Sequence, residues 1–245
     1  MSMKDFEAIL GFHQDEIVDF TDENVNLTRF TIERNMILSK DIDAFYRFKY
    51  FGFYDSRTPK YINILKNDIL EKSKAELYSA FVDLKNNLEN EIYAIFNMLD
   101  WNYRSSSICV VPRSKTINHY KDEQLLFLYT IKHVIHVIDD KLVSYPSIDG
   151  TDFIIRVKNT QTTHLNKSKY GGGDGRHPYK GISLDTCMFS NEIKGKNILL
   201  IDDIYTKTVN VIEDMVQALL DKGAKNVAVY TLGYTVYRGE RDNIY

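Results

Sequence analysis

The sequence predicts an α/β fold in which helices flank a parallel β-sheet. Towards the end of the chain, an apolar strand at Asn197–Ile201 leads through a short turn into an amphipathic helix at Val209–Lys222. A glycine ends this helix, and a second apolar strand follows at Val227–Leu232. Strand, helix and strand in this order form a βαβ unit, whose two strands are parallel. Ser107–Val111, an apolar run stopped by a proline, is typical of a further buried parallel strand.

The remaining elements follow in chain order from the spacing of apolar residues. Asn26–Ile37 places apolar side chains among Thr and Arg, which indicates one or two strands. Pro59–Asp100 has helical spacing and divides into two helices, the second a long one from about Ser73 to Leu99. Asp122–Ile138 predicts another helix, and Phe153–Val157 predicts a strand.

A length of 245 residues suits one elaborated domain, or one domain with a small appendage. The change from helical spacing to short apolar strands after Trp101 divides the chain in two. We expect an N-terminal α+β extension over residues 1–100 and an α/β core over residues 101–245. Hydrophobic residues make up 44% and charged residues 27%, as in globular proteins, which excludes a disordered or fibrous chain.

Cysteine usage and charge narrow the class of protein further. The chain has 2 cysteines, which cannot form a disulfide framework or a four-cysteine zinc site. Its start lacks the pattern of a signal peptide, and no apolar run is long enough to span a membrane. We therefore expect a soluble, cytoplasmic protein. The net charge of −3 argues against direct nucleic-acid binding.

Charged residues and glycines are unevenly distributed. Residues 1–25 contain one Lys against seven Asp or Glu, which indicates a solvated acidic face or a surface that docks a partner. Residues 156–181 contain six Lys or Arg against one Asp, and five of the 12 glycines lie between Gly171 and Gly181. Glycine lets backbone amides approach an anion, and Lys and Arg neutralise it. This basic, Gly-rich stretch therefore predicts a loop that closes over an anionic ligand.

The segment after the first strand of the βαβ unit has the strongest chemical signal. Ligands in open α/β sheets bind at the carboxyl ends of strands, where helix N-termini offer amide donors. Asp202 and Asp203 stand at this edge, where carboxylates can accept hydrogen bonds from a sugar diol or hold a divalent cation. Thr206, Thr208 and Asn210 can donate to a phosphate at the N-terminus of the next helix. The segment contains neither a P-loop nor a G-x-G-x-x-G motif.

An apolar strand, two acidic residues and a Thr-containing turn into a helix resemble the phosphoribosyl-pyrophosphate (PRPP) motif of type I phosphoribosyltransferases. The resemblance implies that Asp202 and Asp203 lie beside the ribose hydroxyls, where PRPP binds together with Mg²⁺. It also implies a turn that wraps the 5-phosphate, formed by Thr206, Lys207, Thr208, Val209 and Asn210.

Three further segments resemble the same family, in particular its ComF-like and amidophosphoribosyltransferase-like branch. Phe48–Gly52 resembles an L-K-Y-x-G signature of that branch. The turn after Ser107–Val111 is similar to the family's pyrophosphate loop, which implies a pyrophosphate contact for Pro112, Arg113, Ser114 and Lys115. The basic, Gly-rich stretch lies where these proteins carry a mobile hood loop, which implies a mobile lid of Lys167, Lys169, Gly171, Gly172, Gly173 and Arg176.

The fold implied by this resemblance is a type I phosphoribosyltransferase-like parallel sheet flanked by helices, with an N-terminal hood. The activity implied is pentosyl transfer in nucleotide metabolism: a Mg-dependent glycosyltransferase moves the phosphoribosyl group of PRPP to a nitrogen acceptor and releases pyrophosphate. Positioning and charge neutralisation would carry most of the catalysis. The sequence leaves open the acceptor and whether the protein forms a homodimer.

The phosphate turn departs from the family pattern and supports an alternative function. Lys207 and Thr208 replace a Thr and a Gly, and Asn210 replaces the last Thr. Glycine tolerates a positive φ that Thr208 would resist, so either the loop takes another shape or phosphate binding is weakened. The alternative is a non-catalytic PRPP- or nucleotide-binding regulatory protein of the same fold, or an accessory of a nucleic-acid-linked bacterial system.

Overall fold

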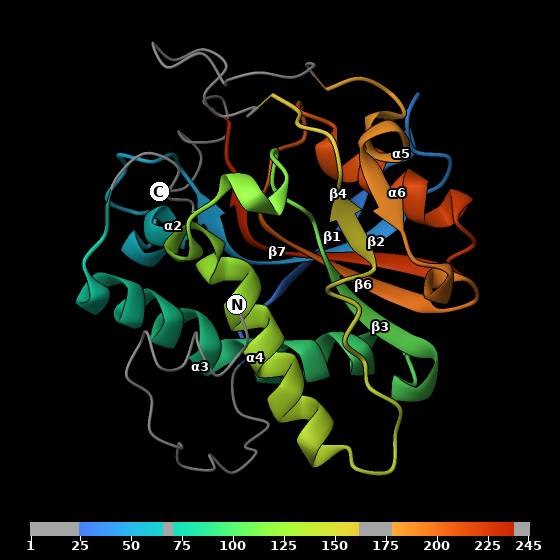
Figure 1. The fold of residues 1–245 in the computed structure, drawn as a ribbon, viewed down its shortest axis with the longest axis horizontal. Helices are drawn as coiled ribbons and strands as arrows, with labels where there is room; N and C mark the ends of the chain where they lie inside the picture. Colours follow the sequence, from blue (N-terminus) through green and yellow to red (C-terminus); the bar gives the residue numbers. More distant parts are fainter. Residues whose placement is uncertain (1–24, 66–70, 162–177, 238–245) are drawn as a thin grey trace.

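A five-stranded β-sheet with helices on both faces forms the α/β fold of the chain (Figure 1). The computed structural model describes residues 25–65, 71–161 and 178–237. The strand order of the sheet is β1-β2-β7-β6-β3. These strands are β1 (Thr28–Ile32), β2 (Ile42–Tyr50), β3 (Ser106–Val110), β6 (Asn197–Tyr205) and β7 (Asn226–Thr235). A separate antiparallel pair consists of β4 (Ile154–Arg156) and β5 (Cys187–Phe189).

The main sheet is mixed, whereas the sequence predicted a parallel one. β2, β7, β6 and β3 run parallel to their neighbours, but β1 pairs antiparallel with β2. The sequence pattern does not reveal β2, which pairs with β7 from Ala44 opposite Val229 to Tyr50 opposite Thr235. Strands on both sides of the predicted boundary at residue 100 therefore hydrogen-bond within one sheet.

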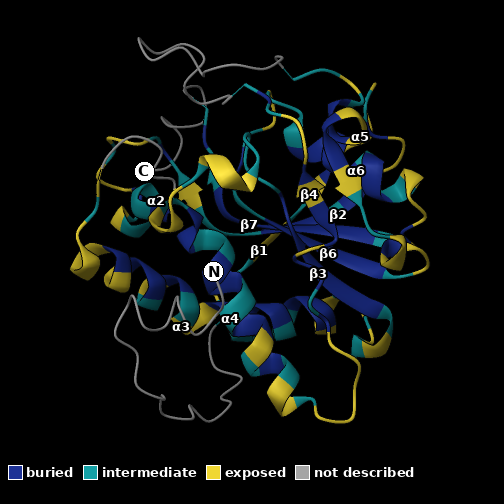
Figure 2. Ribbon diagram, viewed as in Figure 1, coloured by how far each residue is buried: buried dark blue, intermediate teal, exposed yellow. Residues whose placement is uncertain are grey.

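Helices cover the two faces of the sheet as separate layers. The helices α2, α3 and α4 lie over one face, and α5 and α6 lie over the other (Figure 1). Their bounds are α2 (Lys60–Leu65), α3 (Lys74–Met98), α4 (Leu126–Lys141), α5 (Ile182–Thr186) and α6 (Val211–Asp221). Figure 2 shows that β3, β6 and β7 between these layers are largely buried, while the outer faces of α3 and α4 carry exposed residues.

The long helix α3 confirms the prediction from apolar spacing. The predicted bounds, about Ser73 to Leu99, are its two cap residues: Ser73 is the N-cap and Leu99 the C-cap. The Ser73 hydroxyl accepts the backbone N–H of Glu76 at 3.3 Å, and the Glu76 carboxylate accepts the backbone N–H of Ser73 at 2.9 Å. This capping box satisfies two amides that would otherwise have no partner at the start of the helix.

Replacing Ser73 by Ala is expected to lower the free energy of unfolding by about 1 kcal/mol, because the hydroxyl that caps α3 is lost. Chemical denaturation of both proteins measures the difference. The matched control is Lys74→Ala, which alters the adjacent exposed side chain and keeps the cap. An equal loss in the two variants would contradict a capping role for Ser73.

The βαβ unit is confirmed, with β6 longer than the sequence predicted. The prediction ended this strand at Asp202 and Asp203, but β6 continues to Tyr205 because β7 also extends and pairs with it as far as Tyr205 opposite Tyr234. Helix α6 then returns the chain to β7, and Gly223 stops it with a φ of 90°. The two carboxylates therefore lie within the strand, beyond the last β3–β6 pair, in which Val110 lies opposite Ile201.

Two sequence predictions fall on parts of the chain that are not described. The lid residues between Lys167 and Arg176, and the acidic residues before Val25, lie outside the described residues. Within the described ranges, none of the helices is both long enough and apolar enough to cross a membrane.

Candidate functional site

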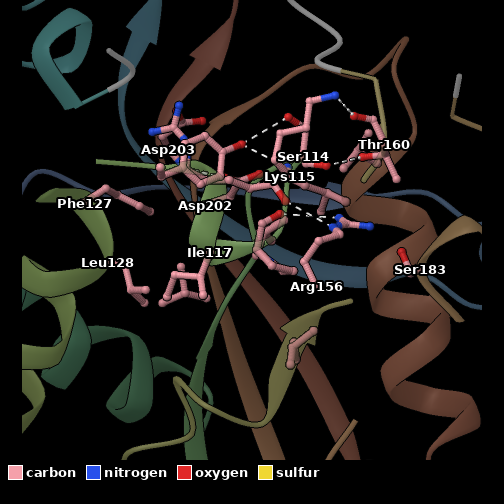
Figure 3. A pocket seen from close by; sticks show the side chains of 18 of the residues that line it. Ser114, Lys115, Ile117, Phe127, Leu128, Arg156, Thr160, Ser183, Asp202 and Asp203 are labelled. Atoms are coloured by element: carbon pink, nitrogen blue, oxygen red, sulfur yellow. Dashed lines mark hydrogen bonds between the residues drawn. The ribbon is translucent and has the colours of Figure 1, made fainter. Parts of the chain in front are cut away.

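A cavity of about 510 Å³ lies at the carboxyl ends of β3 and β6 (Figure 3). These two strands are adjacent and parallel, so the segments that follow them meet at the same edge of the sheet. The structure thereby brings together residues of the predicted pyrophosphate loop, the Asp202–Asp203 pair and the predicted 5-phosphate turn. The predicted site residues that line this cavity are Pro112, Arg113, Ser114, Lys115, Asp202, Asp203, Thr206 and Val209.

Asp202 and Asp203 both line the cavity although they are neighbours in a strand. Regular alternation would direct adjacent side chains to opposite faces of the sheet. The alternation is interrupted at this point: Ile201 and Ile204, three positions apart, both pack in the apolar cluster beneath α3 and α4. Both carboxylates are therefore half-buried side chains at one cavity wall.

The loop after β3 is fixed by hydrogen bonds from Tyr120 and Thr160. The Tyr120 hydroxyl accepts the backbone N–H of Lys115 at 3.0 Å and lies 3.3 Å from the Ser114 hydroxyl. The Ser114 carbonyl accepts the backbone N–H of Thr160 at 2.7 Å, and the Lys115 Nζ donates to the Thr160 carbonyl at 2.9 Å (Figure 3). The Arg113 guanidinium lies over the Tyr120 ring, 4.5 Å from its centroid. Arg113 Nη1 also donates to the Gln124 carbonyl at 2.5 Å, so an aromatic ring and two backbone carbonyls hold two cations at the cavity.

Arg156 hydrogen-bonds to the backbone of the same loop. This residue was not identified from the sequence. Its Nε donates to the Arg113 carbonyl at 3.1 Å and its Nη2 lies 3.5 Å from the Pro112 carbonyl, while its Nη1 donates to the Thr186 hydroxyl at 2.5 Å. The side chain comes from β4 and is buried, and burial lowers the pKa of its guanidinium. The available sequence signal was an arginine inside the apolar strand that the spacing predicted at Phe153–Val157.

Asp214 on α6 binds the start of α5, which lines the cavity. Its carboxylate accepts the backbone N–H of Gly181 at 2.5 Å and that of Ser183 at 2.8 Å. Gly181 has a φ of 91°, which favours glycine at the start of α5. Ser183 lines the cavity, so the first turn of α6 positions α5 against it. This contact cannot be seen in the sequence, where Asp214 is one of two acidic residues near the start of a helix.

The turn from β6 into α6 has another shape than a glycine-containing phosphate loop. Thr206 and Val209 close it with a hydrogen bond from the Val209 N–H to the Thr206 carbonyl at 3.0 Å, and the Thr206 hydroxyl lies 2.7 Å from that of Thr235. The left-handed residue is Asn210, with a φ of 57°, and not Thr208. Asparagine tolerates this conformation, so the turn forms without a glycine.

The turn divides the predicted 5-phosphate residues between two cavities. Thr206 and Val209 line the large cavity, whereas Lys207 and Asn210 line a smaller one of about 210 Å³ on the other side of the turn. Lys207 also lies 3.8 Å from the carboxylate of Glu33. The structure therefore does not bring all five residues of the predicted turn to the cavity that contains Asp202 and Asp203.

Much of the remaining wall of the large cavity is apolar. It is built by α4 and the segment that precedes it, together with the end of α2 and the strand β4. Its apolar side chains include Leu65, Ile117, Phe127, Leu128 and Ile155. The cavity thus combines an edge of charged and hydroxyl groups with a surface that suits a flat or apolar molecule.

A scan of the chain against protein-family models gives no match, and a search of curated proteins finds none that is similar to it. Within the described ranges, no group of three or more His, Cys, Asp or Glu side chains could hold a metal ion. The polar groups that line the cavity include carboxylates, cations and several hydroxyls.

Proposed function

We propose that the chain is a PRPP-binding phosphoribosyltransferase of the type I class, which transfers a phosphoribosyl group to a nitrogen acceptor. One observation supports this proposal most strongly. Pro112–Lys115 and Asp202–Asp203 lie far apart in the sequence, yet both line one cavity at the edge of two parallel strands. Arg113 and Lys115 supply positive charge for a diphosphate, and the carboxylates supply acceptors for a diol.

The donor set suits Mg²⁺ that arrives with its substrate. Mg²⁺ is commonly held by one or two carboxylates together with substrate phosphates and water. Asp202 and Asp203 are two such carboxylates at the wall of the cavity. When bound, the cation would neutralise charge on the diphosphate. Mg²⁺ is therefore the proposed cofactor, and Asp202 and Asp203 are the residues that would contact it.

In the proposed reaction, the bond between the ribose carbon and the diphosphate breaks, and a bond to the acceptor nitrogen forms. Negative charge grows on the departing diphosphate and positive charge grows on the sugar carbon. Arg113 and Lys115 would stabilise the first charge, and Asp202 and Asp203 would fix the sugar hydroxyls. The apolar wall around Phe127 would seat a flat acceptor and exclude water.

The divided turn supports the second candidate, a non-catalytic protein that binds PRPP or a nucleotide. Lys207 and Asn210 line the smaller cavity and not the larger one. The 5-phosphate would then be bound by fewer groups: the hydroxyl of Thr206, the turn backbone and the first turn of α6. A regulatory protein needs binding without turnover, and this reduced set of contacts is compatible with that role. The two candidates share the ligand and differ in whether pyrophosphate is released.

Calorimetric titration with PRPP and Mg²⁺ tests both candidates together, and wild-type protein is expected to bind. Replacing Asp203 by Asn removes a negative oxygen while it keeps the side-chain shape, and the affinity for PRPP with Mg²⁺ is expected to fall at least tenfold. The matched control is Asp152→Asn, an exposed carboxylate at the same cavity that pairs with Lys132. No binding up to millimolar PRPP, with the protein folded, would refute both candidates.

Release of pyrophosphate distinguishes the two candidates. The phosphoribosyltransferase is expected to release pyrophosphate from PRPP when nucleobases or small amines are supplied, and Asp203→Asn would lower that rate. PRPP binding without release across such a panel would favour the regulatory protein.

A further inference from the structure

The smaller cavity, of about 210 Å³, lies on the opposite side of the β6–α6 turn from the proposed PRPP site. It is bounded by the end of β1, the residues after β1, the end of β6, the turn and the start of α6. Pockets for drug-sized molecules measure about 300–1,000 Å³, so this cavity suits a smaller molecule or one ring system of a larger one.

Glu213 presents an incompletely bonded carboxylate to this cavity. The residue is 2% exposed. Its Oε1 accepts the Tyr205 hydroxyl at 2.8 Å, whereas its Oε2 is buried and has no hydrogen-bond partner among the described residues. Burial raises the pKa of this carboxyl, although the Tyr205 hydrogen bond opposes the shift. A buried oxygen without a partner is costly, and a ligand that donates an N–H or O–H to Oε2 would remove that cost.

Aromatic rings form the second part of this cavity. Phe30 lies 5.3 Å from Tyr205 and 5.1 Å from Tyr234, measured between ring centroids, and Tyr205 lies 5.6 Å from Tyr234. Tyr46 extends the group from β2, 5.1 Å from Tyr234. Three of these rings, from β1, β6 and β7, line the cavity. Such rings favour contact with the face or edge of a planar ring.

Exposed charges form the third part, at the mouth of the cavity. Arg34 and Lys207 are exposed and contribute positive charge. The carboxylate of Glu33 lies 3.8 Å from Lys207, so it neutralises part of this charge. Exposed ion pairs of this kind are weak, and an anionic group of a ligand can compete for the cation.

We propose that this cavity is a second binding site, for a small planar molecule that has an N–H donor on its ring and an anionic group outside it, as in a nucleoside monophosphate. The ring donates to Glu213 Oε2 and packs against Phe30, Tyr205 and Tyr234. The phosphate reaches Lys207 and Arg34. The site goes beyond the proposed function, because none of its contacts depends on whether PRPP binds at the other cavity.

Adenosine 5′-monophosphate (AMP) is a suitable probe, and its binding to the full chain can be measured by calorimetry. We expect binding to wild-type protein, with a Kd at least tenfold higher in Glu213→Gln, which changes the acceptor at Oε2 into an amide. Arg34→Ala is expected to weaken AMP at least threefold and to leave adenosine binding unchanged. Because Arg34 is exposed, Arg34→Ala should keep the fold, and it tests the proposal even if Glu213→Gln does not fold.

The matched control is Asp203→Asn, which changes only the larger cavity. A nucleotide can also enter that cavity under the proposed function, so binding at the smaller cavity is the AMP binding that Asp203→Asn keeps and Glu213→Gln removes. Three results would overturn the proposal: no AMP binding up to millimolar concentration, equal AMP affinity in wild type and both cavity variants, or loss of AMP binding in Asp203→Asn. The first two say nothing against PRPP binding, which is titrated separately. A failure of PRPP to bind would likewise leave the AMP result standing.

Discussion

Replacing Glu91 by Ala is expected to lower the free energy of unfolding by about 3–5 kcal/mol, the largest effect that we predict for a single residue. Glu91 lies on α3 and is 2% exposed. Both of its carboxylate oxygens bind Arg47 of β2, Oε1 to Nε at 2.7 Å and Oε2 to Nη2 at 2.5 Å. Without Glu91, a guanidinium stays in the apolar layer with no carboxylate to neutralise it.

The pair has further partners that make its geometry specific. The Tyr230 hydroxyl of β7 donates to Glu91 Oε2 at 2.6 Å, and Arg47 Nη1 donates to the Tyr61 hydroxyl of α2 at 3.0 Å. Burial opposes the charge on Arg47, but the attraction of Tyr230 and Glu91 outweighs it and raises the pKa of the guanidinium. This network therefore joins β2, β7, α2 and α3 where the helical layer meets the sheet.

Urea denaturation of three variants distinguishes the ion pair from simple packing. Arg47→Met alone and Glu91→Leu alone should each destabilise the protein strongly, because each leaves one buried charge. The double variant should lose less than the two single losses combined, since no unpaired charge remains. Additive losses would show that the two side chains act independently and would contradict the proposed coupling.

The same network shows why part of the fold escapes sequence reasoning. β2 contains Arg47 between Tyr46 and Phe48, which breaks the apolar pattern of a buried strand. The arginine is acceptable there only because Glu91, 44 positions away in the chain, neutralises it. By contrast, α3, β3 and the βαβ unit were predicted well, because their apolar spacing, caps and glycine stop are local properties of the sequence.

The candidate site likewise has features that follow from the local sequence and features that depend on more distant contacts. The position of Asp202 and Pro112 at one edge of the sheet could be predicted, because both residues directly follow apolar strands that the sequence reveals. The shape of the turn did not, because it depends on Asn210 adopting a left-handed conformation that the pattern of Thr and Lys does not specify. Arg156 was also missed, since its partners are backbone carbonyls of a loop that is 43 positions away in the chain.

Replacing Arg156 by Met is expected to weaken the binding of pyrophosphate with Mg²⁺ about 100-fold, because the loop that carries Arg113 loses its support. Arg156 donates to the carbonyls of Pro112 and Arg113, so under the proposed function it would act on pyrophosphate by positioning this loop. The matched control is Lys158→Met, which removes an exposed cation two positions further along the chain. We expect the control to change the Kd for pyrophosphate less than threefold.

Arg156→Lys separates the position of the loop from the charge of the side chain. Lysine keeps the positive charge, but its ammonium cannot reproduce the hydrogen bonds that the guanidinium makes to Pro112, Arg113 and Thr186 together. If Arg156 positions the loop, this variant should bind pyrophosphate nearly as weakly as Arg156→Met while its melting temperature stays close to that of wild type. Full recovery of binding with lysine would mean that Arg156 acts through its charge, and the support of the loop would then have to come from Tyr120 and Thr160.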